Sequence, residues 1–441
     1  MSALALVARH LGVAITGCDT DPAGAADLAA LGVPVWRGHD PSHVDGARAV
    51  VVTAAVPPDH AELQRARALA IPVVRRADAL GELVAGGETV VAVAGTHGKT
   101  TTTVMVTEAL TAAGRTPTGL AGGRVAAWHG NALVGSPDLF VVEADEYDRS
   151  FLSLTPTVAV VTNVEADHLE CYGTVAALED AFVEFAGRAR RVIVGGDDAG
   201  AGRVAARLGV PVWRVGLGAD ADVRIRDVVQ EPAGPRATVD LPGGTSVRLR
   251  LAVPGVHNVR NAATALAVLH AVEADVTAGA KALATFGGVG RRFERLGEAG
   301  GVTVVDDYAH HPTEIAATLA AARQAFPGRR VVAVFQPHLY SRTALHGVAL
   351  GEALAAADVV VVAPIYAARE HPPAGGGVTH DLVARSAIRA GAATVAVRER
   401  AHLTSHVARA VRAGDVVFTL GAGDVTRVGP ELLGILKARR T

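Results

Sequence analysis

Cysteine is scarce in this sequence, since only Cys18 and Cys171 occur among 441 residues. The two lie far apart and neither belongs to a CxxC pair, which argues against a disulfide framework and against a thiolate metal site. We therefore expect both cysteines to be small buried residues.

Long apolar runs and an excess of charge are also missing. No apolar stretch approaches the length of a membrane span, and no basic segment with a signal-like core follows Met1. The formal net charge of −2 gives no sign of the excess positive charge that binds nucleic acid or an anionic membrane. These absences predict a cytoplasmic protein that binds neither. The length and the 50% hydrophobic content predict a globular chain of two to three domains.

Lysine is rare as well, because arginine supplies most of the positive charge. The only lysine before Lys281 is Lys99, in the segment 89–103, TVVAVAGTHGKTTTT. A β-branched run, two bracketing glycines and a row of hydroxyl residues predict a strand, a phosphate loop and a helix that runs to Gly114. The generic motif has four residues between its glycines and this loop has two. The context of strand, loop and helix nevertheless predicts phosphate binding.

Acidic and imidazole side chains follow the next two predicted strands. The apolar run 138–142 leads to Glu143, and the strand 157–162 leads to His168. The carboxyl ends of parallel strands form the edge where open α/β sheets bind ligands. Glu143, at the end of a Walker-B-like strand, is therefore a candidate metal ligand and His168 a candidate ligand-binding residue, and solvated caps are the alternative for both. Further candidates are Asp145, Glu146 and Asp167.

The remaining segments predict α/β structure on both sides of this unit. Residues 223–251 have the pattern of a β-hairpin, and Asn258 and Asn261, before a helix, are either ligands or helix caps. A glycine-rich hinge at 287–290 precedes further strands that alternate with helices.

The N-terminal segment also alternates helices and strands, with a strand predicted at 13–16. Asp19 falls just past this strand, where such folds place a carboxylate for a nucleotide. The strand and glycine-rich turn that should precede the first helix are missing from the chain. We therefore expect weaker binding of a nucleotide substrate in this 441-residue form than in a form that restores the turn.

Seven sequence blocks, in order along nearly the whole chain, resemble the Mur ligases of bacterial cell-wall synthesis. They are 95–101 (GTHGKTT), 143–146 (EADE), 162–168 (TNVEADH), 257–261 (HNVRN), 290–294 (GRRFE), 306–312 (DDYAHHP) and 335–338 (FQPH). The resemblance is greatest to the branch that joins L-alanine to UDP-N-acetylmuramate, through an acyl phosphate made with ATP, in peptidoglycan precursor synthesis.

The resemblance implies an α/β fold of three domains. A Rossmann-like domain for the UDP-substrate would occupy 1–86, a P-loop ATPase-like domain with a parallel sheet 87–290, and a Rossmann-like amino-acid-binding domain 291–441. ATP and Mg²⁺ would be the cofactors, and UDP-N-acetylmuramate and L-alanine the substrates. The protein would be a monomer or a homodimer.

The resemblance also implies site residues. ATP phosphates would be bound by Gly95, Thr96, His97, Gly98, Lys99, Thr100 and Thr101. One Mg²⁺ would be held by Thr100 and Glu143, and a second by His168. Other contacts to ATP would come from His257, Asn258 and Asn261 at the adenine, Arg291 or Arg292 at the γ-phosphate, and Asp306 or Asp307 at the ribose. The substrates would meet Asp19, Tyr308, His310 and Arg342, and the catalytic side chains would be Lys99, His310 and Arg342.

Two departures from the family pattern bear on these roles. Leu339 stands where many relatives have an arginine, which leaves Arg342 as the clamp for the carboxylate of alanine. No lysine lies between Lys99 and Lys281, so a carbamylated lysine cannot hold the second metal. Folylpolyglutamate synthases share the architecture without the later blocks. The alternatives are a ligase that adds a preformed murein peptide and a non-catalytic nucleotide-binding regulator.

Overall fold

The computed structural model describes residues 1–368, 370–373, 376–397 and 399–439. By their contacts these residues form two compact units, which are treated separately below. The first comprises 1–227, 237–250 and 260–286, and the second comprises 228–236, 251–259 and the chain from Gly287 onward. The second unit begins its long segment at the predicted hinge. The finer boundaries after residues 86 and 290 stay predictions.

The N-terminal part of the first unit contains two small parallel sheets, β1 with β2 and β3 with β4. Its elements are α1 (Ser2–His10), β1 (Gly17–Asp19), α2 (Ala26–Ala30), β2 (Val35–Arg37), β3 (Val50–Val52), α3 (Ala61–Ala68), β4 (Val73–Arg75) and α4 (Arg76–Val84).

The strand predicted at 13–16 is wrong. Gly12, with φ +82°, ends α1 in the left-handed conformation, and the N–H of Val13 donates to the carbonyl of Ala8 at 3.0 Å. Val13 therefore belongs to the helix cap and cannot begin a strand. The strand starts at Gly17, so Asp19 is its last residue rather than a residue beyond it.

The rest of the first unit carries a sheet of ten strands in the order β14-β13-β12-β11-β10-β9-β5-β8-β6-β7. Strands β5, β8 and β9 are buried almost throughout and parallel, as their continuous apolar sequences predict. The predicted parallel α/β fold is confirmed, and the sheet is mixed only in part, since β7 at its end runs antiparallel to β6. The strands are β5 (Thr89–Ala94), β6 (Thr118–Val125), β7 (Gly130–Leu133), β8 (Leu139–Glu143), β9 (Val158–Val161), β10 (Arg191–Gly195), β11 (Val212–Gly216), β12 (Val223–Val229), β13 (Arg236–Asp240) and β14 (Ser246–Arg250).

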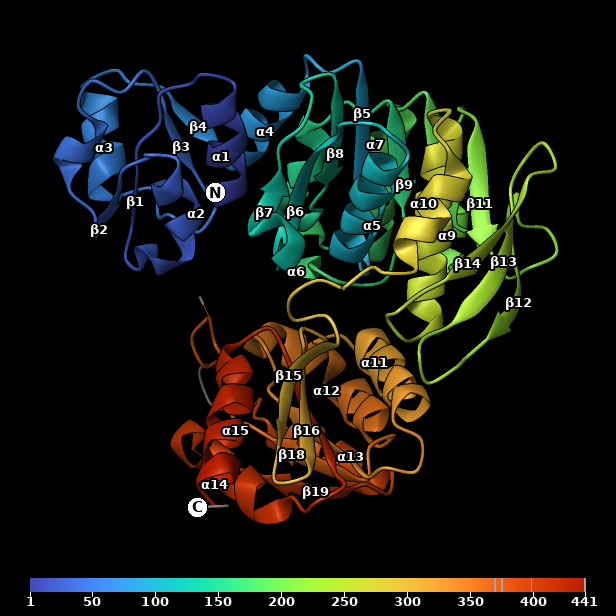
Figure 1. The fold of residues 1–441 in the computed structure, drawn as a ribbon. Coiled ribbons are helices and arrows are strands. Elements are labelled where there is room, and N and C mark those ends of the chain that lie inside the picture. Colours follow the sequence, from blue (N-terminus) through green and yellow to red (C-terminus); the bar gives the residue numbers. More distant parts are fainter. Residues whose placement is uncertain (369, 374–375, 398, 440–441) are drawn as a thin grey trace. The chain divides into compact units, whose positions relative to one another are not determined.

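Helices α5 and α10 lie side by side against this sheet (Figure 1). Helix α5 ends as predicted, because Gly114 takes the left-handed conformation at φ +79° just after it. The helices of this region are α5 (Lys99–Ala112), α6 (Leu169–Tyr172), α7 (Val175–Gly187), α8 (Ala199–Ala205), α9 (Val256–Ala271) and α10 (Val276–Leu283).

The second unit holds a sheet of six strands in the order β15-β16-β20-β17-β18-β19, which is parallel except that β15 is antiparallel to β16. Its elements are β15 (Glu294–Ala299), β16 (Val302–Asp307), α11 (Pro312–Ala325), β17 (Val331–Phe335), α12 (Tyr340–Leu354), β18 (Val359–Val362), α13 (Asp381–Arg389), β19 (Ala393–Ala396), α14 (Arg400–Ala410), β20 (Val416–Leu420) and α15 (Val428–Ala438).

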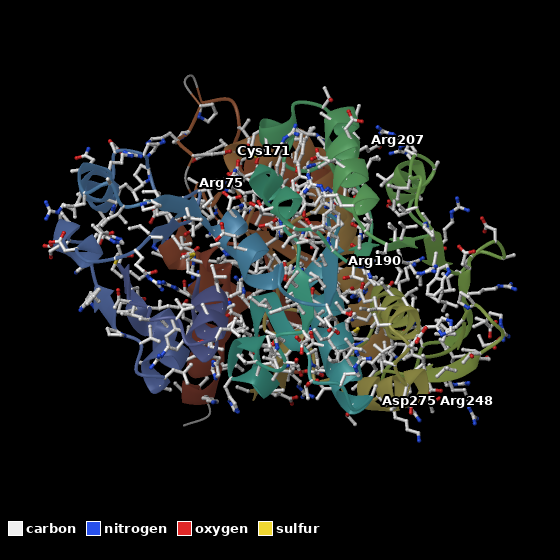
Figure 2. All side chains as sticks on the ribbon, turned by 90° about the horizontal axis from the view of Figure 1, so that it is seen from above. Arg75, Cys171, Arg190, Arg207, Arg248 and Asp275 are labelled. Atoms are coloured by element: carbon white, nitrogen blue, oxygen red, sulfur yellow. The ribbon has the colours of Figure 1, made fainter. Side chains whose placement is uncertain are left out.

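Arginine, which supplies most of the positive charge in the sequence, is found on the surface. Arg190, Arg207 and Arg248 are exposed and carry positive charge on the first unit (Figure 2). Both cysteines are only partly buried, so the expectation of two buried cysteines is wrong. Among the described residues, no helix has the length and apolarity needed to cross a membrane.

Candidate active site

The phosphate loop joins β5 to α5, and both of its glycines are required by their surroundings. Gly95 has φ +129°, and a Cβ added there would lie 2.1 Å from Oγ1 of Thr162. Gly98 has φ +81°, and its added Cβ would lie 2.8 Å from Oδ1 of Asn261. Because L side chains rarely adopt such φ values and have no room here, only glycine fits at either position.

The loop is held by the segment that follows β9. The backbone N–H of His97 donates to Oδ1 of Asn163 at 2.8 Å, and its carbonyl accepts from Oγ1 of Thr162 at 2.6 Å. The hydroxyl of Thr96 accepts from the N–H of Glu165 at 2.9 Å. These bonds fix the shape of the loop without any ligand, so little ordering remains to be done when one binds.

Lys99, in the first turn of α5, is mostly buried, with 14% of its side chain exposed, and it is ion-paired. Its Nζ lies 2.7 Å from Oε2 of Glu146 and donates to the carbonyl of Gly95 at 2.6 Å. Burial by itself would lower the pKa of Lys99, but the neighbouring charges of Glu146 and Asp145 outweigh it, and the net direction is upward. Lys99 is therefore a permanent cation at the phosphate loop.

Glu143 and Thr100 stand on adjoining elements at the same edge of the sheet. Glu143 ends β8 and is paired with Val93 of β5, the strand that leads through the loop to Thr100. Oε2 of Glu143 accepts from the N–H of Gly122 at 2.5 Å, and an added Cβ on Gly122 would lie 2.6 Å from Oε1. A hydroxyl and a carboxylate are hard oxygen donors of the kind that Mg²⁺ prefers.

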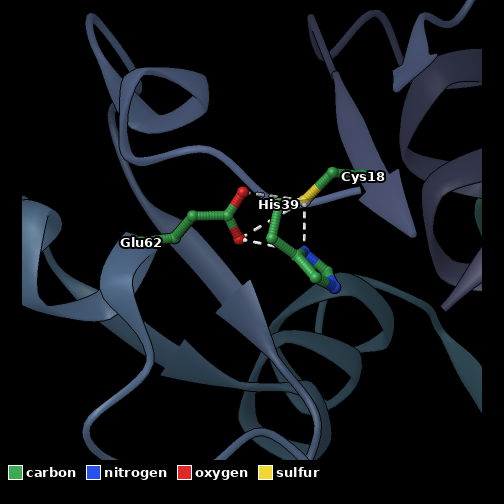
Figure 3. A group of neighbouring side chains, drawn as sticks. All are labelled: Cys18, His39 and Glu62. Carbon is green, nitrogen blue, oxygen red and sulfur yellow. Dashed lines mark hydrogen bonds and ion pairs between the residues drawn. The ribbon is translucent and has the colours of Figure 1, made fainter. Parts of the chain in front are cut away.

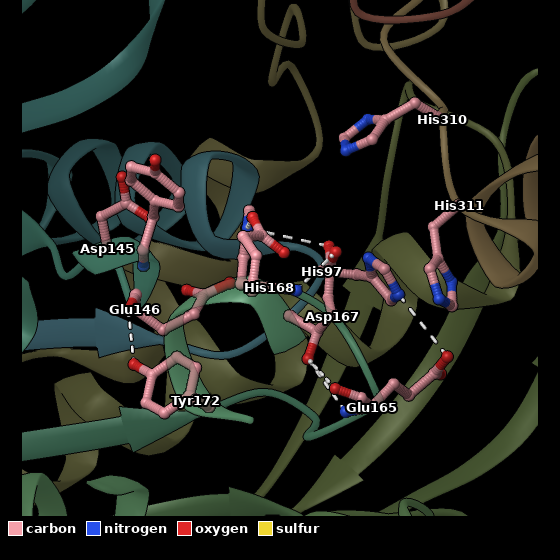
Figure 4. Close-up of polar contacts among 12 residues, drawn as sticks. His97, Asp145, Glu146, Glu165, Asp167, His168, Tyr172, His310 and His311 are labelled. Carbon is pink, nitrogen blue, oxygen red and sulfur yellow. Dashed lines mark hydrogen bonds and ion pairs between the residues drawn. The ribbon is translucent and has the colours of Figure 1, made fainter. Parts of the chain in front are cut away.

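His168 lies on the same edge, after β9, with a left-handed backbone at φ +53°. Its Nε2 is 3.8 Å from Oδ2 of Asp167, its Nδ1 is 3.5 Å from Oε1 of Glu170, and its ring meets Tyr147 edge-on at 5.1 Å (Figure 4). A strained, non-glycine backbone among carboxylates is characteristic of functional sites.

Glu146 and Tyr172 lie at this edge and make contacts that the sequence did not reveal. The hydroxyl of Tyr172 donates to the carbonyl of Glu146, which fixes the residue that pairs with Lys99 (Figure 4). The acidic cluster was a signal for Glu146, but its pairing with Lys99 depends on a turn that periodicity does not describe. Tyr172 carries no signal in the sequence.

In the second unit, the two arginines of the GRRFE block flank one tyrosine. The guanidinium groups of Arg291 and Arg292 lie 4.9 and 5.1 Å from the ring centre of Tyr308. Arg291 also donates to Oδ2 of Asp306 at 3.0 Å, and Arg292 to Oε1 of Glu314 at 3.3 Å. The structure thus places both candidates for the γ-phosphate beside Tyr308, one of the candidates for the alanine site.

The two aspartates of the DDYAHHP block point inward. Asp306 is 1% exposed and accepts from Thr426 at 2.8 Å, besides its pair with Arg291. Asp307 accepts from the N–H groups of Phe293 and Ala309, both at 2.8 Å, and burial raises its pKa to about 6. Their oxygens serve the fold of this unit, and the predicted contact of either with the ribose stays a prediction.

His310 and Arg342 belong to the same unit. Nδ1 of His310 lies 2.9 Å from the carbonyl of Tyr308 and 3.3 Å from Oε2 of Glu314. Because both neighbours are acceptors, Nδ1 carries a proton, and Nε2 holds the lone pair in the neutral ring. Arg342 is buried in the first turn of α12.

The remaining candidates lie on α9 and β1. Asn258 and Asn261 are inside α9, which begins at Val256, so neither is a cap. The side chain of Asn258 donates to the carbonyl of Pro254 at 2.7 Å, and Asn261 lies against Gly98 of the phosphate loop. His257 shares the first turn of α9, and Asp19 is exposed at the carboxyl end of β1. Their roles stay predictions.

Models of one protein family match nearly the whole chain. The Mur ligase family catalytic domain matches residues 1–87, the Mur ligase middle domain 93–269, and the Mur ligase glutamate ligase domain 291–423. The chain belongs to the Mur ligase family and has its three-domain α/β fold. Membership in this family implies the use of ATP.

Relatives with known names indicate which branch of the Mur ligase family this chain resembles. The UDP-N-acetylmuramate–L-alanine ligase of Cutibacterium acnes is 46% identical over 450 residues, which cover 100% of this chain and 94% of that protein. The enzyme of the same name from Kineococcus radiotolerans is 45% identical, with the same coverage.

Solved structures of Mur ligases are similar to this chain over its whole length. The UDP-N-acetylmuramate-alanine ligase of Thermotoga maritima superposes with a TM-score of 0.84 at 28% identity, covering 100% of this chain and 97% of the other. A murein peptide ligase of Psychrobacter arcticus gives a TM-score of 0.74 at 25% identity, covering 99% and 96%.

Proposed function

We propose that this protein joins L-alanine to UDP-N-acetylmuramate at the expense of ATP, in the synthesis of peptidoglycan precursors. The observation that carries the proposal is the similarity to ligases of this name over the whole chain, at 46% identity. The geometry of the phosphate loop, with a buried lysine behind two obligatory glycines, supports a nucleotide-dependent reaction.

The first step brings an anionic carboxylate to an anionic phosphate, so its main obstacle is charge. Lys99 would bind the β- and γ-phosphates and neutralise charge as the phosphoryl group moves to the carboxylate. For this its ammonium must exchange the Glu146 carboxylate, 2.7 Å away, for phosphate oxygens.

We further propose that Mg²⁺ is held by Thr100 and Glu143, whose hydroxyl and carboxylate oxygens suit that ion. When bound, Mg²⁺ would supply Lewis-acid stabilisation to the phosphate oxygens. Glu143 is kept in place for this by its bond from Gly122. His168 is the candidate for a second metal, with Asp167 and Glu170 beside its ring nitrogens.

The second step needs a neutral amine beside the activated carboxyl group. Arg342 would bind the carboxylate of alanine as a charge-assisted pair. Nε2 of His310 would accept a proton from the ammonium of alanine, since Nδ1 faces the Tyr308 carbonyl. Tyr308, fixed between the two arginines, would line the same site.

Phosphate release from ATP, measured with UDP-N-acetylmuramate, tests the proposal. The purified chain is assayed with L-alanine, with the murein tripeptide and without an amine, and the product is identified by mass. We expect release that depends on L-alanine and a product heavier by one alanyl residue. Release only with the tripeptide would assign the chain to the peptide-adding branch, and no release with any amine would favour a regulator.

A further inference from the structure

A cluster of three different metal-binding side chains lies in the N-terminal part of the first unit, away from the phosphate loop in sequence. Cys18 is on β1, His39 follows β2, and Glu62 is in the first turn of α3 (Figure 3). Strands β1 and β2 are parallel neighbours, which brings Cys18 beside the residues that leave β2.

The three ligand atoms are within contact distance of one another. Sγ of Cys18 is 3.4 Å from Nδ1 of His39 and 3.1 Å from Oε1 of Glu62, and Nδ1 of His39 is 3.4 Å from Oε2 of Glu62. Tetrahedral zinc, with bonds of about 2.0–2.3 Å, holds such atoms about 3.3–3.6 Å apart. The spacing is therefore close to that of a zinc ligand set.

We propose that Cys18, His39 and Glu62 bind a zinc ion. Thiolate, imidazole and carboxylate together are a ligand set suited to zinc and poorly suited to Mg²⁺ or Ca²⁺. On binding, the S–H proton of Cys18 leaves to solvent and a sulfur–zinc bond replaces it, with no redox change. The zinc ties β1, β2 and α3 together where the sheets are only two strands wide.

The surroundings of the cluster fit such a site. Glu62 is 7% exposed, and its Oε1 also accepts from the N–H of Asp40 at 3.2 Å and lies 2.9 Å from Nδ1 of His43. Contacts of this kind orient a ligating carboxylate. His39 is exposed and leaves the cluster open to an entering ion.

A further histidine lies beside Glu62 of the cluster. Nδ1 of His60 is shielded from solvent, lacks a hydrogen-bond partner among the described residues, and lies 3.7 Å from Oε2 of Glu62. Water or this nitrogen completes the coordination. Without a metal, burial and the Glu62 carboxylate raise the pKa of Cys18 to about 12, so the thiol keeps its proton and donates to Glu62.

Cobalt titration of the full, metal-free chain tests the site, because Co²⁺ replaces zinc and a bound thiolate gives an intense near-ultraviolet charge-transfer band. We expect one Co²⁺ per chain with this band, and its loss when Zn²⁺ is added. Cys18→Ser should abolish the band, whereas the matched control Cys171→Ser should keep it.

Two variants that retain the thiol separate ligand loss from misfolding. Glu62→Gln and His39→Ala should weaken Co²⁺ binding at least tenfold, while His129→Ala, an exposed histidine outside the cluster, should not. A band that persists in Cys18→Ser, or no band at stoichiometric Co²⁺, would overturn the proposal. The readout contains no nucleotide or alanine, so its result is independent of the ligase assay.

Discussion

Lys99 and Glu146 form a buried ion pair, with Nζ 2.7 Å from Oε2 and both side chains at most 14% exposed. The lysine of the phosphate loop is therefore neutralised by the protein itself before phosphate arrives. A buried charge that loses its partner is costly, typically about 3–5 kcal/mol. Nucleotide binding exchanges one anionic partner of Lys99 for another.

Glu146→Gln should consequently destabilise the chain, and ATP should restore part of the loss, because phosphate replaces the missing negative charge. We expect a loss of about 3 kcal/mol without ligand. The control Glu184→Gln breaks the exposed pair with Arg188 and should cost less than about 1 kcal/mol. Thermal unfolding with and without ATP and Mg²⁺ measures both. An equal loss in the two variants, or no recovery with ATP, would contradict the exchange of partners.

Lys99→Ala should abolish turnover, because the phosphoryl group would lose its nearest fixed cation. Removing one charge-stabilising group commonly costs about 10²–10³ in rate. Lys281→Ala removes an exposed lysine on α10 and serves as the control. Phosphate release with L-alanine is the measurement. More than a few per cent of the parent rate in Lys99→Ala would refute the phosphate role.

Gly95→Ala should deform the phosphate loop, since the new Cβ would lie 2.1 Å from Thr162 in a backbone at φ +129°. Strain of this kind costs about 1–3 kcal/mol, and the overpacking adds a similar amount. Gly86→Ala, where nothing lies within 4 Å, is the matched control. Unfolding stability and ATP affinity should both fall only in the first variant, and normal ATP affinity there would argue against the loop.

Asp307 should make stability depend on pH in a direction opposite to most carboxylates. Burial raises its pKa to about 6, above the ordinary value of 3.8, so the folded state holds the proton more tightly than the unfolded state. Its contribution is therefore fully present below about pH 4 and is lost as pH rises through 6, by roughly 3 kcal/mol at about 1.4 kcal/mol per pKa unit.

The comparison of Asp307→Asn with the parent isolates this contribution. The variant lacks the titrating group, so the free energy of unfolding of the parent, minus that of the variant, should fall between pH 4 and 7. Denaturant unfolding at several pH values gives both curves. Parallel curves would show that Asp307 does not titrate in this range.

His310→Gln should lower the rate of amide formation about 10²- to 10⁴-fold if Nε2 accepts the proton of the alanine ammonium. The loss should diminish at high pH, where alanine is already a free amine. A pH-rate profile with L-alanine distinguishes this from an orienting role, for which the loss would be the same at every pH.

Much of the fold follows from local sequence, because buried parallel strands are continuous apolar runs. The strands around Val91 and Val160 lie where these runs predict them. The prediction of a strand at 13–16 was wrong because Val13 takes part in the C-terminal cap of α1. Hydrophobicity does not encode this interaction. The antiparallel strands β7 and β15 also depend on pairing that a single strand sequence cannot specify.

The candidate site could also be predicted only in part from the sequence. The sequence placed Lys99 and Glu143 at one sheet edge because Lys99 follows the loop after one strand and Glu143 lies at the end of another. It could not reveal the pairing of Lys99 with Glu146, or that Asp306 and Asp307 turn inward, because these depend on side-chain directions in turns. The cysteine count argued against a thiolate site, and the proximity of Cys18 to His39 and Glu62, 21 and 44 residues away, depends on tertiary contacts that such a count does not describe.

The hydrogen bonds of Thr162 and Asn163 to the phosphate loop hold the loop rigidly against the start of the segment that carries His168. We expect occupancy of the loop and occupancy of His168 to be thermodynamically coupled. Reciprocity then requires that a metal at His168 raises nucleotide affinity by the same factor by which the nucleotide raises metal affinity.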